Sequence, residues 1–295
     1  MHKERIGVIG GSQGMGKWLV NYFKDKGFEV GFSSNDSRTQ YLTNVQLVTD
    51  SDIIFLAVPI SHMEKVLDQI FPYLEGRTVI DVCSVKSRIV EKFQRLQELY
   101  DRVECDYLSI HPMFAPTIAS VVGQVVLFNY AHVHNPEVTE FWKALFAEDG
   151  AEVMEIDHIE HDKTMGIIQG LNHFNVFVSA KTLARHGDNL ELIKRLSSPT
   201  YRIFVIFFTR YVMQSPRLYA EIQIFNPYVK EIVRLFMEEA QQLLTVIEQQ
   251  DFDGFENYVL GMQPFFASNT EDTQLSNYLI EKLGSYMADK KTVTA

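Results

Sequence analysis

Hydrophobic residues follow different patterns in the two halves of the chain. Between residue 5 and about residue 156, short runs of β-branched residues alternate with amphipathic segments, which is typical of βαβ units on a mainly parallel sheet. Strands are expected at residues 6–9, 29–32, 53–58, 78–82, 107–110, 125–128 and 152–156. The clearest helices between them are predicted at residues 17–26, before Gly27, and at residues 63–73.

Beyond about residue 157 the strand-like runs disappear, and helical periodicity continues to the C-terminus. Breaks are expected at Ser197-Ser198-Pro199, at Ser215-Pro216 and at Gly261. The stretches 167–183 and 201–213 are apolar around most of their circumference, which predicts burial on several sides and a homodimer interface. We therefore expect an α/β domain at residues 1–157 and an all-helical domain at residues 158–295, with a loose tail at 290–295.

The charge balance narrows the choice of partners. Of 295 residues, 27 are Lys or Arg and 38 are Asp or Glu, so the net charge is −11. This excess of acid argues against nucleic acid or an anionic membrane surface as the main partner, although a locally basic pocket can still bind a small anion. No apolar stretch reaches the ~20 residues that a membrane span requires.

The cysteines indicate a reducing compartment. Cys83 and Cys105 are the only two in the sequence. They are too few for a disulfide framework and lack the paired spacing of a zinc site. We therefore expect a cytoplasmic protein without a metal site.

A glycine-rich segment joins the first predicted strand to the first predicted helix. Gly10, Gly11, Gly14 and Gly16 surround the start of that helix, which is expected near Met15. Without Cβ atoms, such a loop lets backbone amides approach a pyrophosphate, and the helix N-terminus adds partial positive charge. The spacing departs from the standard G-x-G-x-x-G pattern. Its position between a strand and a helix nevertheless predicts that these five residues bind a dinucleotide rather than form a plain tight turn.

The segment after the second strand bears on the choice of cofactor. An acidic residue there normally binds the ribose hydroxyl of NAD, whereas an arginine accommodates the extra phosphate of NADP. Asp36 fits the first role, and Ser34 with Arg38 fits the second. A solvated polar turn explains the same side chains without any cofactor. We favour NAD and keep NADP as the alternative.

Polar residues follow several predicted strands. In a doubly wound sheet the carboxyl ends of the strands line the ligand crevice, so residues there are candidates by position. Val58 ends one strand beside the expected cofactor, and Ser84 and Lys86 follow the next strand. Lys86 either binds a substrate carboxylate or is solvated at a helix start. His111 ends a further strand and is either a general base or a structural histidine.

Four polar residues stand out on the apolar helices of the second half. Gln169 and His173 are four residues apart, on one helix face, where polar groups either satisfy hydrogen bonds in the core or reach a ligand. Arg202 and Arg210 flank a strongly apolar run. A carboxylate is the natural bidentate partner of a guanidinium, and it belongs either to a substrate or to a buried Asp or Glu of the protein.

Taken together, these segments resemble a known family. The motifs SVK, HPMF, EHDKTMGIIQGLNHF, SSPTYR and SPRLYAEI are similar to those of the prephenate dehydrogenases of tyrosine biosynthesis, particularly the dehydrogenase half of the enterobacterial fusion with chorismate mutase. The resemblance covers nearly the whole chain, and no mutase-like helices precede the glycine loop. It implies an α/β Rossmann-like N-terminal domain plus an all-α C-terminal dimerisation domain. It also implies NAD(P)-dependent oxidative decarboxylation of prephenate to 4-hydroxyphenylpyruvate.

The resemblance also implies roles for single residues. His111 matches the catalytic histidine that takes the proton of the ring hydroxyl, and Ser84 matches the serine that orients it. Lys86 matches a lysine assigned to substrate binding, and Arg210 matches the arginine that grips the ring carboxylate. The remaining matches are Gln169 and His173, on a helix facing the active site, and Arg202, with a structural role or a place at the pocket edge.

Three alternatives to this function were weighed against the sequence, and one of them lacks its motif. Relatives of the family oxidise arogenate or 4-amino-4-deoxyprephenate, and no residue distinguishes these substrates. A β-hydroxyacid dehydrogenase would have a lysine followed four residues later by asparagine, but Lys163 is followed by Ile167. A non-catalytic dinucleotide sensor would keep the glycine loop without needing His111 and Arg210 together.

Overall fold

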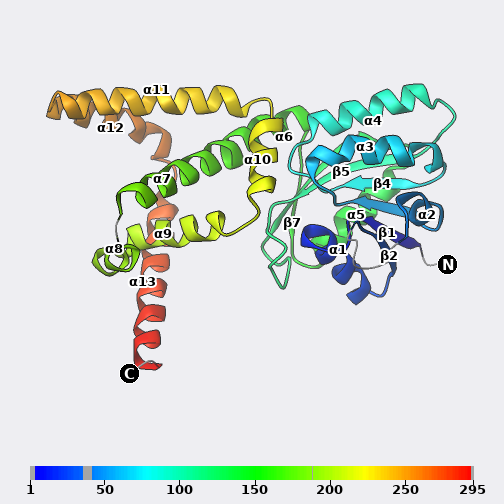
Figure 1. Ribbon diagram of the computed structural model, residues 1–295, viewed down its shortest axis with the longest axis horizontal. Coiled ribbons are helices and arrows are strands. Elements are labelled where there is room, and N and C mark those ends of the chain that lie inside the picture. The colour runs from blue at the N-terminus through cyan, green and yellow to red at the C-terminus, as the bar shows by residue number, and fades with distance from the viewer. Residues whose placement is uncertain (1–3, 36–41, 188, 294–295) are drawn as a thin grey trace. The chain divides into compact units, whose positions relative to one another are not determined.

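The computed structural model describes residues 4–35, 42–187 and 189–293 (Figure 1). It divides the chain into two compact units. The first comprises Met1–Ile168 and Ala220–Tyr228, and the second comprises Gln169–Tyr219 and Val229–Ala295. The sequence predicted a boundary after residue 157. Packing instead joins residues 158–168 and the short segment 220–228 to the first unit.

A single seven-stranded sheet forms the centre of the first unit. Its strands are β1 (Arg5–Ile9), β2 (Glu29–Ser33), β3 (Ile53–Leu56), β4 (Thr78–Asp81), β5 (Asp106–Pro112), β6 (Val125–His132) and β7 (Glu152–Glu155). Their order is β2-β1-β3-β4-β5-β6-β7, and neighbouring strands are parallel except β5 and β6. The seven predicted strands and the mainly parallel sheet are confirmed. The reversal at β6 was not predicted; it follows from residues 113–124, which form no crossover helix.

Helices cover both faces of this sheet (Figure 1). On one face, α1 (Gly14–Asp25) and α5 (Pro136–Glu148) pack into a core cluster that contains Phe55 of β3. The cluster on the other face contains Ile54 and Leu56 and is supplied by α2 (Asn44–Thr49), α3 (Ile60–Ile70), η1 (Phe71–Tyr73) and α4 (Ser87–Leu99). Because successive strand residues point to opposite faces, a strand covered on both sides is apolar throughout, as β3 is.

The helix α6 (His158–Met165) completes the first unit. The carboxylate of Asp157 caps it by accepting hydrogen bonds from the backbone amides of Ile159, at 2.8 Å, and Glu160. Asn226, in the returning segment 220–228, donates to the backbone carbonyl of Asp162 at 2.8 Å. Ile222 of the same segment lies in the core cluster against α3 and α4. The returning segment is thus part of the core of this unit.

Helices make up the second unit. They are α7 (Asn172–His186), α8 (Leu190–Leu196), α9 (Pro199–Val212), α11 (Val229–Glu248), α12 (Phe252–Phe266) and α13 (Thr270–Val293). The π-helical segment η2 (Gly166–Leu171) and the helix α10 (Pro216–Phe225) are each divided between the two units. The all-helical prediction is confirmed, with breaks before Pro199 and Pro216. The break expected at Gly261 is wrong, because one glycine costs a helix only about 1 kcal/mol. The loose tail is also wrong as far as Val293, where α13 ends.

Apolar side chains of the second unit are poorly covered. On α9, Val205 is buried, but Phe204, Ile206 and Phe207 are 52%, 48% and 47% exposed. The burial on several sides predicted for this stretch is therefore not met within one chain, and large uncovered apolar surfaces mark interaction sites. Among the described helices, none combines the length and the apolar composition needed to cross a bilayer.

Candidate active site

The glycine loop lies between β1 and α1, as predicted. Gly10 and Gly14 have φ values of +90° and +55°, a backbone region that favours glycine. A Cβ atom on Gly16 would lie 2.2 Å from the carbonyl oxygen of Gly10, so no side chain fits at this position of the first turn of α1. A Cβ on Gly14 would meet nothing within 4 Å. The loop therefore leaves open space at the helix N-terminus, where the pyrophosphate of a dinucleotide fits.

The ends of β2 and β3 contact this loop. The backbone amides of Gly10 and Gly11 donate to the carbonyl of Ser33 at 3.0 and 3.2 Å. The hydroxyl of Ser34 lies 2.6 Å from that of Ser12 within the loop. A Cβ on Gly10 would lie 3.1 Å from a methyl carbon of Val58. Ser34 and Val58 thus lie beside the glycine loop, and their contacts with a cofactor remain predictions.

Two residues expected to choose between NAD and NADP, Asp36 and Arg38, lie outside the described residues. Their predicted roles remain predictions.

His111 lies near the end of β5 and is only 3% exposed. Its Nδ1 atom lies 2.9 Å from Nε2 of His161, which belongs to α6. Burial, followed by the charges of His161 and Lys86, holds the pKa of His111 well below its usual value of 6.5. The imidazole is therefore neutral near pH 7, the state that a general base requires.

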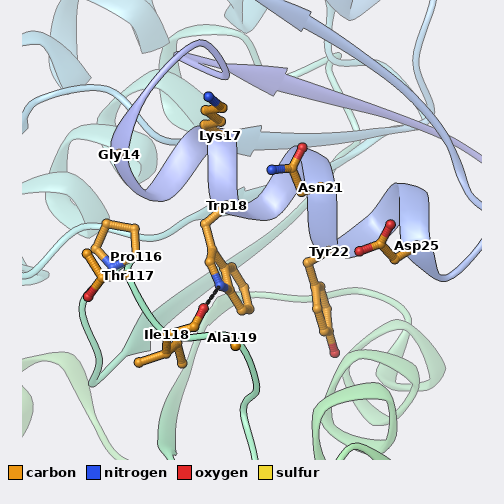
Figure 2. Close-up of a pocket in the computed structure, with 10 residues that line it drawn as sticks. All are labelled: Gly14, Lys17, Trp18, Asn21, Tyr22, Asp25, Pro116, Thr117, Ile118 and Ala119. Carbon is orange, nitrogen blue, oxygen red and sulfur yellow. Dashed lines mark hydrogen bonds between the residues drawn. The ribbon is translucent and has the colours of Figure 1, made fainter. Parts of the chain in front are cut away.

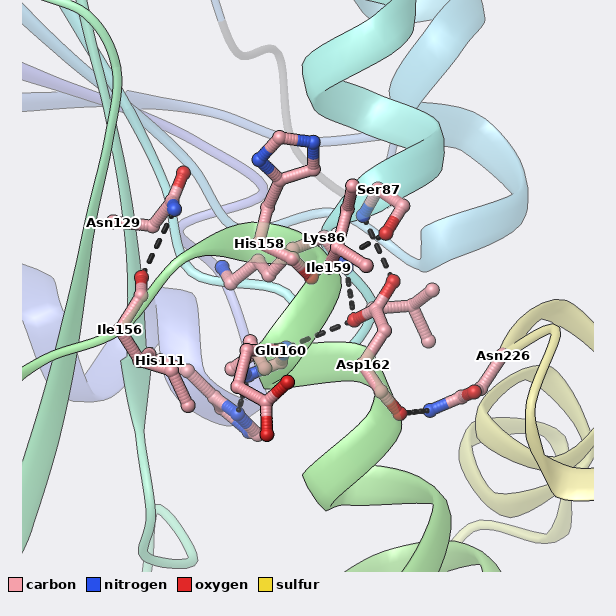
Figure 3. Close-up of polar contacts among 12 residues, drawn as sticks. Lys86, Ser87, His111, Asn129, Ile156, His158, Ile159, Glu160, Asp162 and Asn226 are labelled. Carbon is pink, nitrogen blue, oxygen red and sulfur yellow. Dashed lines mark hydrogen bonds and ion pairs between the residues drawn. The ribbon is translucent and has the colours of Figure 1, made fainter.

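His161 and Asp162 form a second layer behind His111. Nδ1 of His161 lies 2.8 Å from Oδ1 of Asp162, and the two side chains are 1% and 0% exposed. Figure 3 shows the Asp162 carboxylate turned toward the start of α4, where it accepts hydrogen bonds from the backbone amides of Lys86 and Ser87, each at 2.8 Å. Burial alone would raise the pKa of Asp162, but the hydrogen bonds from His161, Lys86 and Ser87 outweigh it and lower the pKa.

The sequence had singled out the segment containing these two residues but gave neither a role. A histidine and an aspartate that follow a capping Asp157 look like a solvated first turn of a helix. Only packing against the start of α4, more than 70 residues away in the chain, buries them.

Lys86 is anchored inside the protein. Its ammonium donates to Oδ1 of Asp81 at 2.7 Å and to the carbonyl oxygen of Ile110, next to His111, at 2.6 Å. The hydroxyl of Tyr107 donates to the other oxygen of Asp81 at 2.8 Å. Lys86 is only 1% exposed, so its ammonium is not solvated and its charge is balanced by the carboxylate of Asp81. A direct contact between Lys86 and a substrate carboxylate remains a prediction. The geometry favours an indirect role, in which Lys86 holds the backbone at Ile110 and so the position of His111.

Ser84 lies half-buried in the loop between β4 and α4. The partner that the structure shows on Nδ1 of His111 is His161. The orienting role predicted for Ser84 therefore remains a prediction, and it would have to act elsewhere on the His111 ring.

In the second unit, His173 lies in an aromatic cluster. Its ring centre is 5.3 Å from that of Tyr211 and 4.8 Å from that of Tyr219. Burial lowers the pKa of His173 to about 4. Its Nδ1 atom is buried and has no hydrogen-bond partner among the described residues. A buried, unsatisfied ring nitrogen is what a ligand-binding histidine would show.

The two arginines have different environments. Arg210 is exposed, and no carboxylate of the described residues forms an ion pair with it. The positive charge of Arg210 lowers the pKa of the nearby Tyr219, but burial outweighs it and raises that pKa to about 12. Arg202 instead donates to the backbone carbonyl of Lys194 at 2.9 Å, between α8 and α9. Gln169 is half-buried in η2. The substrate contacts expected for these residues remain predictions.

A cavity of about 570 Å³ lies along the outer side of α1 (Figure 2). Trp18 in its wall donates to the carbonyl of Ile118 at 3.2 Å, and the rings of Trp18 and Phe114 are 5.0 Å apart. The loop after His111 is thus fastened to the helix that follows the glycine loop. Of the residues predicted for the site, Gly14 alone lines this cavity, so we do not assign it to the substrate.

Comparison with known proteins gives matches over most of the chain. The model described as "Prephenate dehydrogenase, nucleotide-binding domain" matches residues 28–154, and "Prephenate dehydrogenase, dimerization domain" matches residues 157–260. A "Probable arogenate/prephenate dehydrogenase" of Methanocaldococcus jannaschii is 29% identical over 97% of this chain, and a "T-protein" of Enterobacter agglomerans is 29% identical over 84% of it. The chain spans about 64% of the length of each of these relatives.

Solved structures share the fold. Prephenate dehydrogenase from Aquifex aeolicus, in complex with hydroxyphenyl propionate and NAD⁺, has a TM-score of 0.70 at 16% identity and covers 91% of this chain and 99% of its own. Arogenate dehydrogenase from Synechocystis has a TM-score of 0.63 at 20% identity and covers 90% of this chain and 100% of its own. At these identities the likeness supports the architecture alone.

Proposed function

Because the chain belongs to the prephenate dehydrogenase family, we propose that it catalyses the NAD-dependent oxidative decarboxylation of prephenate to 4-hydroxyphenylpyruvate in tyrosine biosynthesis. The observation that carries this proposal is the neutral, buried imidazole of His111 at the carboxyl end of β5. The glycine loop follows the carboxyl end of β1, and carboxyl ends of parallel strands share one edge of the sheet. A base and a dinucleotide loop at one edge fit the oxidation of an alcohol.

The chemistry assigns His111 one task. The ring carbon that bears the hydroxyl loses its hydrogen as a hydride, and the base takes the hydroxyl proton. The bond to the ring carboxylate then breaks, carbon dioxide leaves, and the bonding electrons make the ring aromatic. The phenol oxygen ends with a proton again, so His111 returns to its neutral state. Such a base contributes about 10²–10⁴-fold to the rate.

The glycine loop would hold the cofactor. NAD supplies the hydride acceptor when bound. Gly10, Gly11, Gly14 and Gly16 leave the room that the pyrophosphate needs, and Met15 lies in the first turn of α1, whose N-terminus favours an anion. Ser34 and Val58 border the same loop. A similar structure described with NAD⁺ supports NAD as the first choice. NADP is the alternative to be compared with it.

Prephenate carries two carboxylates, so cations should hold it. We assign the ring carboxylate to Arg210, which has no carboxylate partner among the described residues and has a planar group suited to bidentate binding. His173 and Gln169 are the next candidates. Arg202, bonded to Lys194, is assigned a structural role.

Arogenate is the second candidate substrate. One relative is named a probable arogenate/prephenate dehydrogenase, and arogenate differs from prephenate by an amine in the side chain. The deciding experiment measures turnover of prephenate, arogenate and 4-amino-4-deoxyprephenate, each with NAD and with NADP. We expect the highest kcat/KM for prephenate with NAD. Absence of turnover with all three substrates would refute the proposal.

We also propose that the chain forms a homodimer through the second unit. The uncovered apolar side chains of α9 and the dimerisation domain matched at residues 157–260 support it. Sedimentation equilibrium should give twice the mass of the 34.0 kDa chain.

A further inference from the structure

The imidazole of His111 is the first member of a buried series that ends in a carboxylate. Nδ1 of His111 lies 2.9 Å from Nε2 of His161. The other ring nitrogen of His161, Nδ1, lies 2.8 Å from Oδ1 of Asp162. We propose that His161 and Asp162 are positioning residues, which hold His111 in the single neutral tautomer that has its proton on Nδ1 and its lone pair on Nε2. This inference rests on the function proposed above, in which His111 is the base.

The direction of the hydrogen bonds starts at Asp162. Its two oxygens accept from the backbone amides of Lys86 and Ser87, which are donors only. These bonds keep the carboxylate ionised, as its lowered pKa also indicates. An ionised carboxylate only accepts hydrogen bonds, so Nδ1 of His161 must carry the proton that it shares with Oδ1.

The protonation state of His161 then determines which nitrogen of His111 carries the proton. Burial lowers its pKa despite the neighbouring Asp162, so the ring is neutral and has one proton, on Nδ1. Its Nε2 atom is therefore an acceptor. The proton in the contact between the two rings must belong to Nδ1 of His111, and the neutral His111 ring keeps its lone pair on Nε2.

The surroundings of His111 disfavour the charged form of the base, as its lowered pKa indicates. When Nε2 of His111 has accepted a proton, the ring is a cation in a buried site, which is costly without a partner. The nearby ammonium of Lys86 is already neutralised by Asp81, so it opposes the cation less than an unpaired lysine would.

The backbone around Asp162 is held firmly enough to fix the series. Asn226 donates to the carbonyl of Asp162 at 2.8 Å, and the Asp162 carboxylate joins α6 to the start of α4 (Figure 3). The geometry is therefore set before any ligand arrives, which is the requirement for a positioned base.

Two substitutions of His161 test the role. In His161→Gln, the amide nitrogen faces the Asp162 carboxylate, so the amide oxygen still accepts from Nδ1 of His111. In His161→Leu no acceptor is left. We expect kcat to fall at least about 10²-fold in the Leu variant, with KM changed less than threefold, and to stay within roughly tenfold of the parent in the Gln variant. Equal kcat in the parent and the Leu variant would overturn the proposal.

Asp162→Asn removes the charge that sets the direction of both hydrogen bonds, so one tautomer should give way to a mixture and kcat should fall. Asp157→Asn is its matched control. Asp157 is also an Asp that caps a helix start, and its carboxylate bonds to the backbone amides of Ile159 and Glu160 rather than to the His161 ring. Its backbone carbonyl, which accepts from the amide of His161, is kept in the variant, and asparagine caps equally well. We expect no change in kcat for the control. A loss as large as that of Asp162→Asn would assign the effect to helix capping and overturn the proposal.

Nitrogen-15 NMR of histidine-labelled protein reads the tautomer without any substrate. The His111 signals are assigned by their loss in His111→Asn. The proposal requires an unprotonated Nε2 and a protonated Nδ1 in the parent and in His161→Gln, and a mixture in His161→Leu. A protonated Nε2 in the parent overturns it. Because this measurement needs no turnover, it separates failure of the tautomer proposal from failure of the proposed enzyme activity.

Discussion

The ammonium of Lys86 lies 2.7 Å from the carboxylate of Asp81, and neither side chain is more than 1% exposed. A buried ion pair gains little over apolar residues of the same size, but removal of one partner leaves a charge without compensation. This pair therefore behaves differently under single and double substitution.

Asp81→Asn should lower the free energy of unfolding by about 3–5 kcal/mol, because the Lys86 ammonium then remains buried without a counter-charge. Urea unfolding measures the effect. Asp81→Asn combined with Lys86→Met should recover much of the loss, because both charges are gone. A double variant as unstable as the sum of the two single variants would contradict the pairing.

The stability contributed by Asp81 should depend on pH. Burial alone would raise its pKa, but the charge and hydrogen bond of Lys86 outweigh burial and lower it below the usual 3.8. A lowered pKa in the folded state stabilises the protein fully above the unfolded value and is lost as the pH falls through the folded value. The stability difference between the parent and Asp81→Asn should therefore be constant above about pH 5 and shrink below pH 3.8. A difference that grows on acidification would refute this assignment.

The rate should depend on pH through His111. Its pKa lies well below 6.5, first because of burial and then because the charges of Lys86 and of a protonated His161 would repel a second cation. Since the neutral ring is the active form, kcat/KM should be flat through pH 6.5 and fall only at more acidic pH.

Lys86→Met removes a positive charge, so the pH at which kcat/KM falls on the acid side should be higher. Lys92→Met, a lysine on the same helix paired with Asp68, is the control and should leave the profile unchanged.

Alanine substitutions at three glycines distinguish a loss of stability caused by backbone strain from a loss of cofactor affinity. Gly14→Ala and Gly76→Ala each force a side chain into a positive φ, of +55° and +68°, in open space. Both should cost about 1–2 kcal/mol of stability. Only Gly14→Ala should also weaken NAD binding, by roughly tenfold or more, because a charge-assisted hydrogen bond is worth about 1.5–3 kcal/mol. Gly76 precedes β4, at the opposite edge of the sheet. Gly16→Ala should be less stable than both, because its Cβ would meet a backbone oxygen at 2.2 Å.

Substitutions at His111 and Arg210 should affect different kinetic constants. His111→Asn should reduce kcat by about 10²–10⁴-fold with little change in substrate affinity, because it removes the base alone. Arg210→Gln should mainly raise KM, because it removes a charge that holds the substrate. Arg202→Gln, which breaks the bond to Lys194, should lower stability and leave KM unchanged. Parental kinetics in both His111→Asn and Arg210→Gln would refute the site.

Local patterns were sufficient wherever the cause of the structure is local. The strands of the sheet follow from apolar runs of strand length, and the glycine loop follows from positions that favour glycine, such as Gly10 at a φ of +90°. The break before Pro199 follows from the fixed geometry of proline. Gly261 failed as a helix end because a glycine only weakens a helix, and α12 continues through it.

The buried polar network was decided by tertiary structure alone. The sequence singled out His111 and Lys86 by their positions after strands, but it did not show that Lys86 is neutralised by Asp81 or that His161 contacts His111. These pairs join residues that are distant in the chain or in different elements, and whether a polar side chain is solvated or buried depends on what packs over it. A sequence pattern fixes which face of an element a residue occupies, whereas only the packed elements fix which other residue it meets there.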